Sequence, residues 1–217
     1  MRRMMGITAL TLGLLGWPVT GGWSYNQNDL EKFLRTNQCP KCDLSGADLS
    51  GRFLAGADLS AANLRGANLE HSNLWRANLK NVDLTSANLA RAHLSQASLN
   101  NADLSGADLT QADLSLARMQ FVWLTNARLT AAQLSLANLY GARMQNANLS
   151  HAAVRQTDLR KADLEGAIMR KADYGNANAT AGSKDSTINY SSLGGPLLSL
   201  KQISTMAVYD GPQKWKR

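Results

Sequence analysis

Two cysteines and three histidines are the residues of this chain with the most obvious chemistry. Cys39 and Cys42 form a Cys-Pro-Lys-Cys motif, a spacing that can activate a thiolate in a redox protein. Redox motifs of this kind open a helix beside a βαβ unit, and no such unit is visible nearby. A short structural disulfide is the alternative, and the pattern favours it. A zinc site would need two further ligands at a sensible spacing, which the sequence does not supply.

The histidines and most acidic residues fall inside a five-residue repeat that runs from Cys42 to Ala181 without an insertion or deletion. The unit reads Ala-(Asp/Asn)-Leu-x-x and fills 28 pentads. Its first residue is Ala in 22 pentads and its third residue is Leu in 22. In a helix these leucines would spread around the axis, and in a flat strand they would alternate between faces.

The chain must therefore bend once per pentad, so that the first and third residues stay inside. Ser, Thr, Asn and Gly collect at the fourth and fifth positions, which places the bend there. Proline is absent from Lys41 to Gly195, so every coil keeps its backbone N–H groups for pairing with its neighbours.

This repeat resembles the pentapeptide-repeat family, and more specifically its exported, cyanobacterial-type members with an N-terminal helix cap and a Cys pair. The resemblance implies an all-β solenoid, a right-handed quadrilateral parallel β-helix of about seven coils with short α-helical caps. It also implies four pentads, or 20 residues, in each coil. The same resemblance implies the periplasm or the thylakoid lumen as the location.

With 20 residues per coil, the positions of surface side chains follow from arithmetic. His71 and His151 lie four coils apart, about 19 Å at the spacing of stacked strands, so they cannot share a metal. His93 belongs to another face. The Asp and Asn side chains at second positions are expected to hydrogen-bond the backbone near each corner. The sequence therefore predicts no catalytic set, no cofactor site and no metal site, and the protein is not expected to be an enzyme.

Residues 1–21 have the pattern of a secretory signal peptide. Arg2 and Arg3 precede an apolar run from Ile7 to Trp17, which is too short to span a bilayer. Cleavage is expected after Gly21 or Ser24, leaving no integral membrane span. The alternative is an uncleaved anchor or a tucked N-terminal helix.

Residues 22–41 are predicted to form a helical cap over the open end of the first coil, because solenoids need terminal caps. A helix is expected from Asn28 to Thr36, with Asn28 as its N-cap and an apolar face on Leu44 and Leu49. The repeat occupies residues 42–181. Residues 182–217 are predicted to be a C-terminal cap, with a short helix after Pro196, and a tail.

One stretch of the repeat departs from the pattern, between Arg118 and Arg143. Five of six consecutive pentads there lack Asp or Asn at the second position, and apolar residues occupy outward positions. An apolar patch rimmed by arginine is typical of a partner surface; drift on a tolerant exterior is the alternative. The candidate patch comprises Leu116, Arg118, Phe121, Trp123, Arg128, Leu136, Tyr140 and Arg143.

The net charge is +7, but the repeat itself holds 13 Lys or Arg and 12 Asp or Glu. This near-neutral rod does not predict a nucleic-acid partner. It also disfavours a DNA mimic that binds topoisomerases, which would need an acidic surface. The sequence favours an exported structural or protein-interaction scaffold; a redox protein centred on the Cys pair is the other alternative. Association of copies end to end or through the patch is left open.

Overall fold

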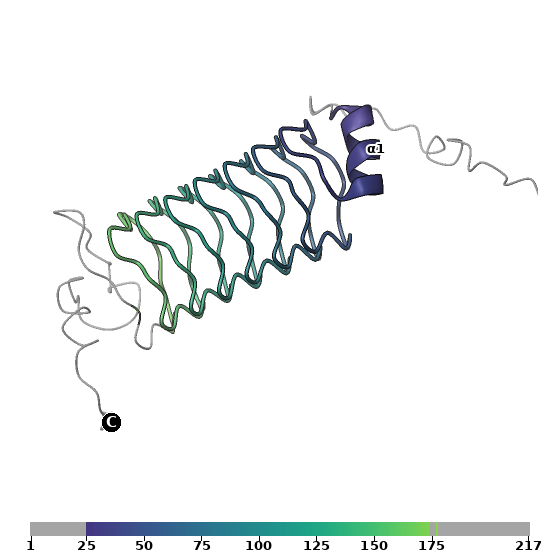
Figure 1. Ribbon diagram of the computed structural model, residues 1–217. Helices are drawn as coiled ribbons and strands as arrows, with labels where there is room; N and C mark the ends of the chain where they lie inside the picture. The colour runs from purple at the N-terminus through teal and green to yellow at the C-terminus, as the bar shows by residue number, and fades with distance from the viewer. Residues whose placement is uncertain (1–24, 174–176, 178–217) are drawn as a thin grey trace, which may run out of the picture.

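The computed structural model describes residues 25–173 and Ala177. The predicted signal peptide at 1–21 and the predicted C-terminal cap and tail at 182–217 lie outside the described residues. Figure 1 shows an elongated stack of coils with one helix, α1, lying across its N-terminal end.

The coils pair through parallel bridges between residues that are 20 apart, from Gln38 with Asp58 to Ala153 with Asp173. Each pentad contributes one bridge residue, its second, so the strands are very short. Four pentads complete a coil and give the rod four faces, which we name after their first residues: the Gln38, Asp43, Asp48 and Phe53 faces. The rungs of the Gln38 face, one per coil, are Gln38, Asp58, Asn78, Ser98, Arg118, Asn138 and Asp158. The chain therefore folds as a right-handed quadrilateral parallel β-helix of seven coils.

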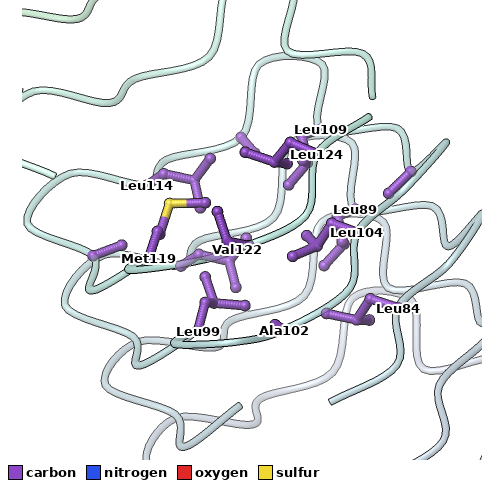
Figure 2. Packing of buried hydrophobic residues seen from close by; sticks show 14 of the residues in the cluster. Leu84, Leu89, Leu99, Ala102, Leu104, Leu109, Leu114, Met119, Val122 and Leu124 are labelled. Carbon is purple, nitrogen blue, oxygen red and sulfur yellow. The ribbon is translucent and has the colours of Figure 1, made fainter. Parts of the chain in front are cut away.

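First and third residues of the pentads form the interior, as predicted. Third-position leucines and Met119 point inward together with the first-position residues Ala102 and Val122 (Figure 2). Burying each leucine contributes about 1.5–3 kcal/mol before conformational entropy is counted. Arg52 is the described exception, because this first-position residue is exposed. It lies in the first coil, where the open end of the stack lets a long charged side chain reach water.

The corners are tight turns in which the N–H of each first residue donates to the carbonyl of the third residue before it, as in Ala107 to Leu104 at 3.0 Å. The fifth residue has a positive φ at every corner from Lys41 to Lys171, a pattern typical of a type II turn. Glycine fills only part of these positions, as at Gly106 with φ 68°. Most corners therefore hold a side chain in the left-handed region, which costs about 1–2 kcal/mol relative to an ordinary conformation.

Helix α1 spans Gln27–Thr36 and closes part of the N-terminal end. Its N-cap is Asn26, which accepts hydrogen bonds from the N–H groups of Asn28 and Asp29, so the prediction of Asn28 as the cap is wrong by two residues. Phe33 is buried in the core. The Asp29 carboxylate accepts the N–H of Asp43 at 2.9 Å, a donor that has no coil below it. The helix thus protects one strand edge of the first coil.

Candidate functional site

The candidate patch occupies the fifth and sixth coils and the end of the fourth. Leu116 and Leu136 lie at the corner between the Phe53 and Gln38 faces, and the Leu116 N–H donates to the carbonyl of Ser135 in the next coil. Arg118 follows on the Gln38 face. Phe121 and Tyr140 occupy the next corner. The two leucines and Phe121 are each about half exposed, at 48%, 51% and 51%.

Trp123 and Arg143 bridge one another on the adjoining Asp43 face. The Arg143 guanidinium lies 4.4 Å from the centre of the Trp123 ring, a cation–π contact. Seven of the eight predicted residues are therefore continuous around two faces and the corners beside them. Arg128 is the exception, because it lies one face further on and its Nε is 3.8 Å from Asp108.

The Phe121 ring is held in place by its neighbours in the next coil. It meets Tyr140 edge to face, with ring centroids 5.5 Å apart. A Cβ added to Gly141 would lie only 2.7 Å from two atoms of the Phe121 ring. The absence of a side chain at Gly141 is thus what lets the ring fold over this corner.

Large apolar residues occur at left-handed corner positions only in this part of the described structure. Between Lys41 and Lys171 the fifth residues are otherwise glycine, alanine or polar residues. The three exceptions are Leu116, Phe121 and Leu136, with φ of 61°, 56° and 63°. Each is both exposed and backbone-strained, a combination that folding alone does not favour.

At regular second positions the Asp and Asn side chains do what the sequence predicted. The Oδ1 atom of Asp83, for example, accepts the N–H of Thr85 at 2.9 Å. Hydrogen bonds from the Ser50 side chain and N–H hold the pKa of Asp48 below its ordinary value, despite partial burial. Near the other end, hydrogen bonds from Arg160 lower the pKa of Asp158. These carboxylates hold the corner turns beside them.

One arrangement was missed by sequence reasoning. His93 Nδ1 lies 3.0 Å from the Asp113 carboxylate, and its Nε2 lies 3.2 Å from the Ser95 hydroxyl. These three side chains therefore lie together, a grouping that the sequence analysis did not single out. The His93 and Asp113 side chains are 45% and 35% exposed, so the water-excluded surroundings that strengthen a catalytic triad are missing here. His93 takes the place of Asn or Asp in the second-position ladder, so its contacts follow from the stacking: Asp113 is the next residue of that ladder and Ser95 lies two residues ahead.

Cys39 and Cys42 are joined by a disulfide, and their side chains are buried. Cys39 and Cys42 are also the third and first residues of a corner, because the Cys42 N–H donates to the Cys39 carbonyl. Coil geometry therefore begins one pentad before the predicted boundary at residue 42. Asp29 lies within 4.8 Å of both sulfurs, but a disulfide sulfur is not a thiolate ligand, so this trio holds no metal in the oxidised protein.

Phe53 is an exposed apolar residue outside the patch that the sequence analysis did not single out. It is 78% exposed at the open N-terminal end. Together with Arg52 and the C-terminal half of α1 it lines a hollow of about 460 Å³. The Arg-Phe pair replaces Ala-Asp in its pentad, a signal in the sequence that was available. Within the described residues, no helix is long and apolar enough to cross a membrane.

Comparison with known proteins agrees with this architecture. The Pentapeptide repeats family matches the chain in eight copies, over residues 42–81, 77–115, 112–150 and 147–180. Proteins of this family are generally non-catalytic structural or interaction scaffolds. A search of curated proteins found no match.

Several solved structures are similar to the chain. A pentapeptide repeat protein from the thylakoid lumen of Arabidopsis thaliana is 32% identical, with a TM-score of 0.45, over 55% of this chain and 77% of that one. HetL, a pentapeptide repeat protein involved in heterocyst differentiation regulation from the cyanobacterium Nostoc, is 30% identical, with a TM-score of 0.29, over 67% and 86%. QnrB1, a plasmid-mediated fluoroquinolone resistance protein, is 22% identical, with a TM-score of 0.37, over 61% and 67%. Since the family match covers more than half of its residues, this chain belongs to the pentapeptide repeat family.

Proposed function

We propose that this protein is an exported, non-enzymatic scaffold that binds another protein through the patch on its fifth and sixth coils. The observation that carries the proposal is the clustering of Leu116, Phe121 and Leu136. These are the large apolar residues at left-handed corners of the described structure, and all are about half exposed. Asn or Gly at the same corners would relieve backbone strain and expose less apolar surface to water, so the three large side chains indicate a surface role.

A double variant tests the patch directly. Phe121→Ser with Leu136→Ser removes the apolar centre, and Leu34→Ser with Trp75→Ser is the matched control. The control removes two exposed apolar side chains elsewhere, which are 47% and 39% exposed. Proteins captured by the purified chain from its own organism are quantified by mass spectrometry. We expect at least one partner to be lost with the patch variant and retained with the control; equal capture by both variants contradicts the proposal.

Export is supported by the signal-like residues 1–21 and by the disulfide, since such bonds persist in oxidising compartments. Periplasm and thylakoid lumen both meet that condition. Cell fractionation with mapping of the mature N-terminus tests it. We expect a chain that begins near Gly21 or Ser24; a cytoplasmic chain that retains residues 1–21 contradicts export.

Each of the three alternative functions, a serine hydrolase, a redox protein and a DNA mimic, has its own test. A fluorophosphonate probe reports whether Ser95 is a nucleophile activated by His93. We expect the wild type to be labelled no more than the His93→Asn variant. Burial of Cys39 and Cys42 argues against disulfide exchange, and an insulin-reduction assay is expected to show none. A topoisomerase inhibition assay tests the DNA-mimic alternative, which the cationic patch and near-neutral rod disfavour.

A further inference from the structure

The near-neutral total charge of the repeat hides an uneven distribution. Residues 114–157 contain no Asp or Glu and four arginines, whereas residues 42–113 contain eight Asp or Glu and five Lys or Arg. The acid-free segment comprises the coils that carry the patch. Two of these arginines, Arg118 and Arg143, lie on the same surface as the exposed apolar side chains, so positive charge accompanies the patch.

Two arginines of the patch have guanidinium N–H donors that no ion pair of the described residues engages. Among the residues that the structure describes, Arg118 and Arg143 form no ion pair, and their side chains are exposed. Arg143 is positioned by stacking on Trp123, which leaves its N–H groups free to bind an acceptor. A guanidinium already oriented on an aromatic ring loses less entropy when it pairs with a carboxylate.

The neighbouring carboxylates are already engaged. Asp158 accepts two hydrogen bonds from Arg160, each 2.8 Å long, and Asp163 accepts the Gln145 amide at 2.6 Å. Asp163 follows Arg143 in the ladder of the Asp43 face, but none of the ion pairs among the described residues joins the two. Carboxylates of a partner can therefore complement Arg118 and Arg143. A second copy joined through this patch would set an acid-free surface against itself, which like charges oppose.

The shape of the patch further limits the class of partner that can contact all of it. Leu116 and Leu136 lie at one edge of the Gln38 face, whereas Trp123 lies beyond its opposite edge, on the Asp43 face. A planar bilayer surface can contact one face of a rod but not both sides of a corner. Nucleic acid offers phosphates and base faces but no apolar complement to paired leucines. A protein segment can bend around the corner and supply both carboxylates and apolar side chains.

Building on the proposed function, we infer that the patch recognises an acidic, apolar segment of another protein. Carboxylates of that segment pair with Arg118 and Arg143, and its large apolar side chains pack between Leu136 and Phe121. The pairing makes the affinity fall with salt, because the charges are exposed at the rim.

A phage-displayed peptide library screened on the full chain tests this inference without knowledge of the natural partner. We expect the selected peptides to combine Asp or Glu with Leu, Phe or Trp. Their synthetic versions should bind about tenfold more weakly to Arg143→Gln, the loss typical of one charge-assisted hydrogen-bonding pair. Arg91→Gln is the matched control, because it removes one exposed arginine of the third coil, outside the patch, where Arg91 bonds Gln111.

The outcomes separate the inference from the proposed function. Peptides without acidic residues that nevertheless lose binding in Phe121→Ser with Leu136→Ser overturn the inference and leave the protein-binding patch intact. Both the inference and the proposed function are overturned if no selected peptide depends on the patch and the patch instead binds phosphatidylglycerol vesicles or single-stranded DNA. Equal weakening by Arg143→Gln and Arg91→Gln also overturns the inference, since the effect is then one of net charge alone.

Discussion

Coils 58–97 and coils 118–157 share one backbone geometry but use their second residues differently. In the first pair of coils, six of eight second residues are Asp or Asn whose Oδ1 accepts the N–H two residues ahead. In the second pair, only Asn138 and Asn148 do so. The bridges between coils continue unchanged through both regions, and the leucines are equally buried.

The difference shows which parts of the repeat build the rod. Buried apolar third residues and the hydrogen bonds between coils recur in both regions, whereas the polar ladder outside does not. Second and fifth positions can therefore change to serve a surface role without loss of the fold. The patch on the fifth and sixth coils is where this freedom is used.

The largest expected effect separates the interior from the patch. Leu89→Ala removes a fully buried side chain and should cost about 2–5 kcal/mol of unfolding free energy. Leu136→Ala, at an exposed corner, should change it by no more than about 0.5 kcal/mol. Urea unfolding followed by circular dichroism measures both. Similar costs for the two changes would mean that the patch leucine is structural.

The disulfide is expected to act locally at the first coil. Closing a loop of four residues contributes about 2 kcal/mol in the chain-entropy description. Coils contact only their neighbours, so reduction should raise hydrogen exchange at Leu44 N–H far more than at Leu129 N–H. Cys39→Ala with Cys42→Ala is the control, because its exchange should not respond to reductant. A uniform rise along the rod would contradict local action.

Gly141 and Phe121 are expected to be coupled. Gly141→Ala introduces a left-handed alanine and a Cβ that meets the Phe121 ring, whereas Gly56→Ala meets no atom within 4 Å. Backbone strain alone should cost about 1 kcal/mol at either site. Displacing the ring should add about 1 kcal/mol at Gly141 only, and Phe121→Ser should remove that addition. A double-mutant cycle in urea measures the coupling, and additive costs would show that the ring does not depend on Gly141.

Most of the fold was predictable because one repeat pattern indicates the spacing of the turns, the buried positions and the residues at the corners. The boundary of the coils was less clear, because Cys39 replaces the leucine and Pro40 follows it, which hides the first pentad. Asn26 caps α1 in place of Asn28 because the cap is decided by backbone conformation, and either residue type fits. Arg52 occupies an inward position of the pattern, and its exposure depends on its place at the open end, which the repeat alone does not reveal.

The patch was partly predictable for a different reason. Stacking every 20 residues places Leu116 beside Leu136 by arithmetic, but it does not tell which side chains turn toward one another. The cation–π contact between Arg143 and Trp123 and the fold of Phe121 over Gly141 depend on rotamers. The Ser95, His93 and Asp113 arrangement was missed because two coils contribute to it, and only the ladder between residues 93 and 113 indicates it.

A smaller effect tests whether the patch keeps strain that folding does not need. Leu136→Asn places a residue that tolerates a positive φ at this corner, as Asn101 already does with φ 58°. The unfolding free energy should rise by about 0.5–1 kcal/mol while partner capture falls. Asn101→Leu is the reverse change on a regular corner and should lower stability by a similar amount. A stability loss in Leu136→Asn would indicate that the leucine packs favourably.

The smallest expected effect concerns acid and a carboxylate of the polar ladder whose pKa is lowered in the folded protein. Burial raises the pKa of Asp58, but hydrogen bonds from Ser60 and Asn78 outweigh it and lower the pKa below 3.8. A lowered pKa in the folded state contributes stability above the unfolded value near 4, and that stability is lost as the pH falls through the folded value. Asp58→Asn keeps the acceptor for the Ser60 N–H, as Asn63 does for Arg65, and removes the titration. The variant should be less stable than the wild type by a few tenths of a kcal/mol at neutral pH, since the group is partly exposed, and equal to it near pH 2. Thermal melts across this range measure the gap, and a gap that persists in acid would assign the loss to packing and not to charge.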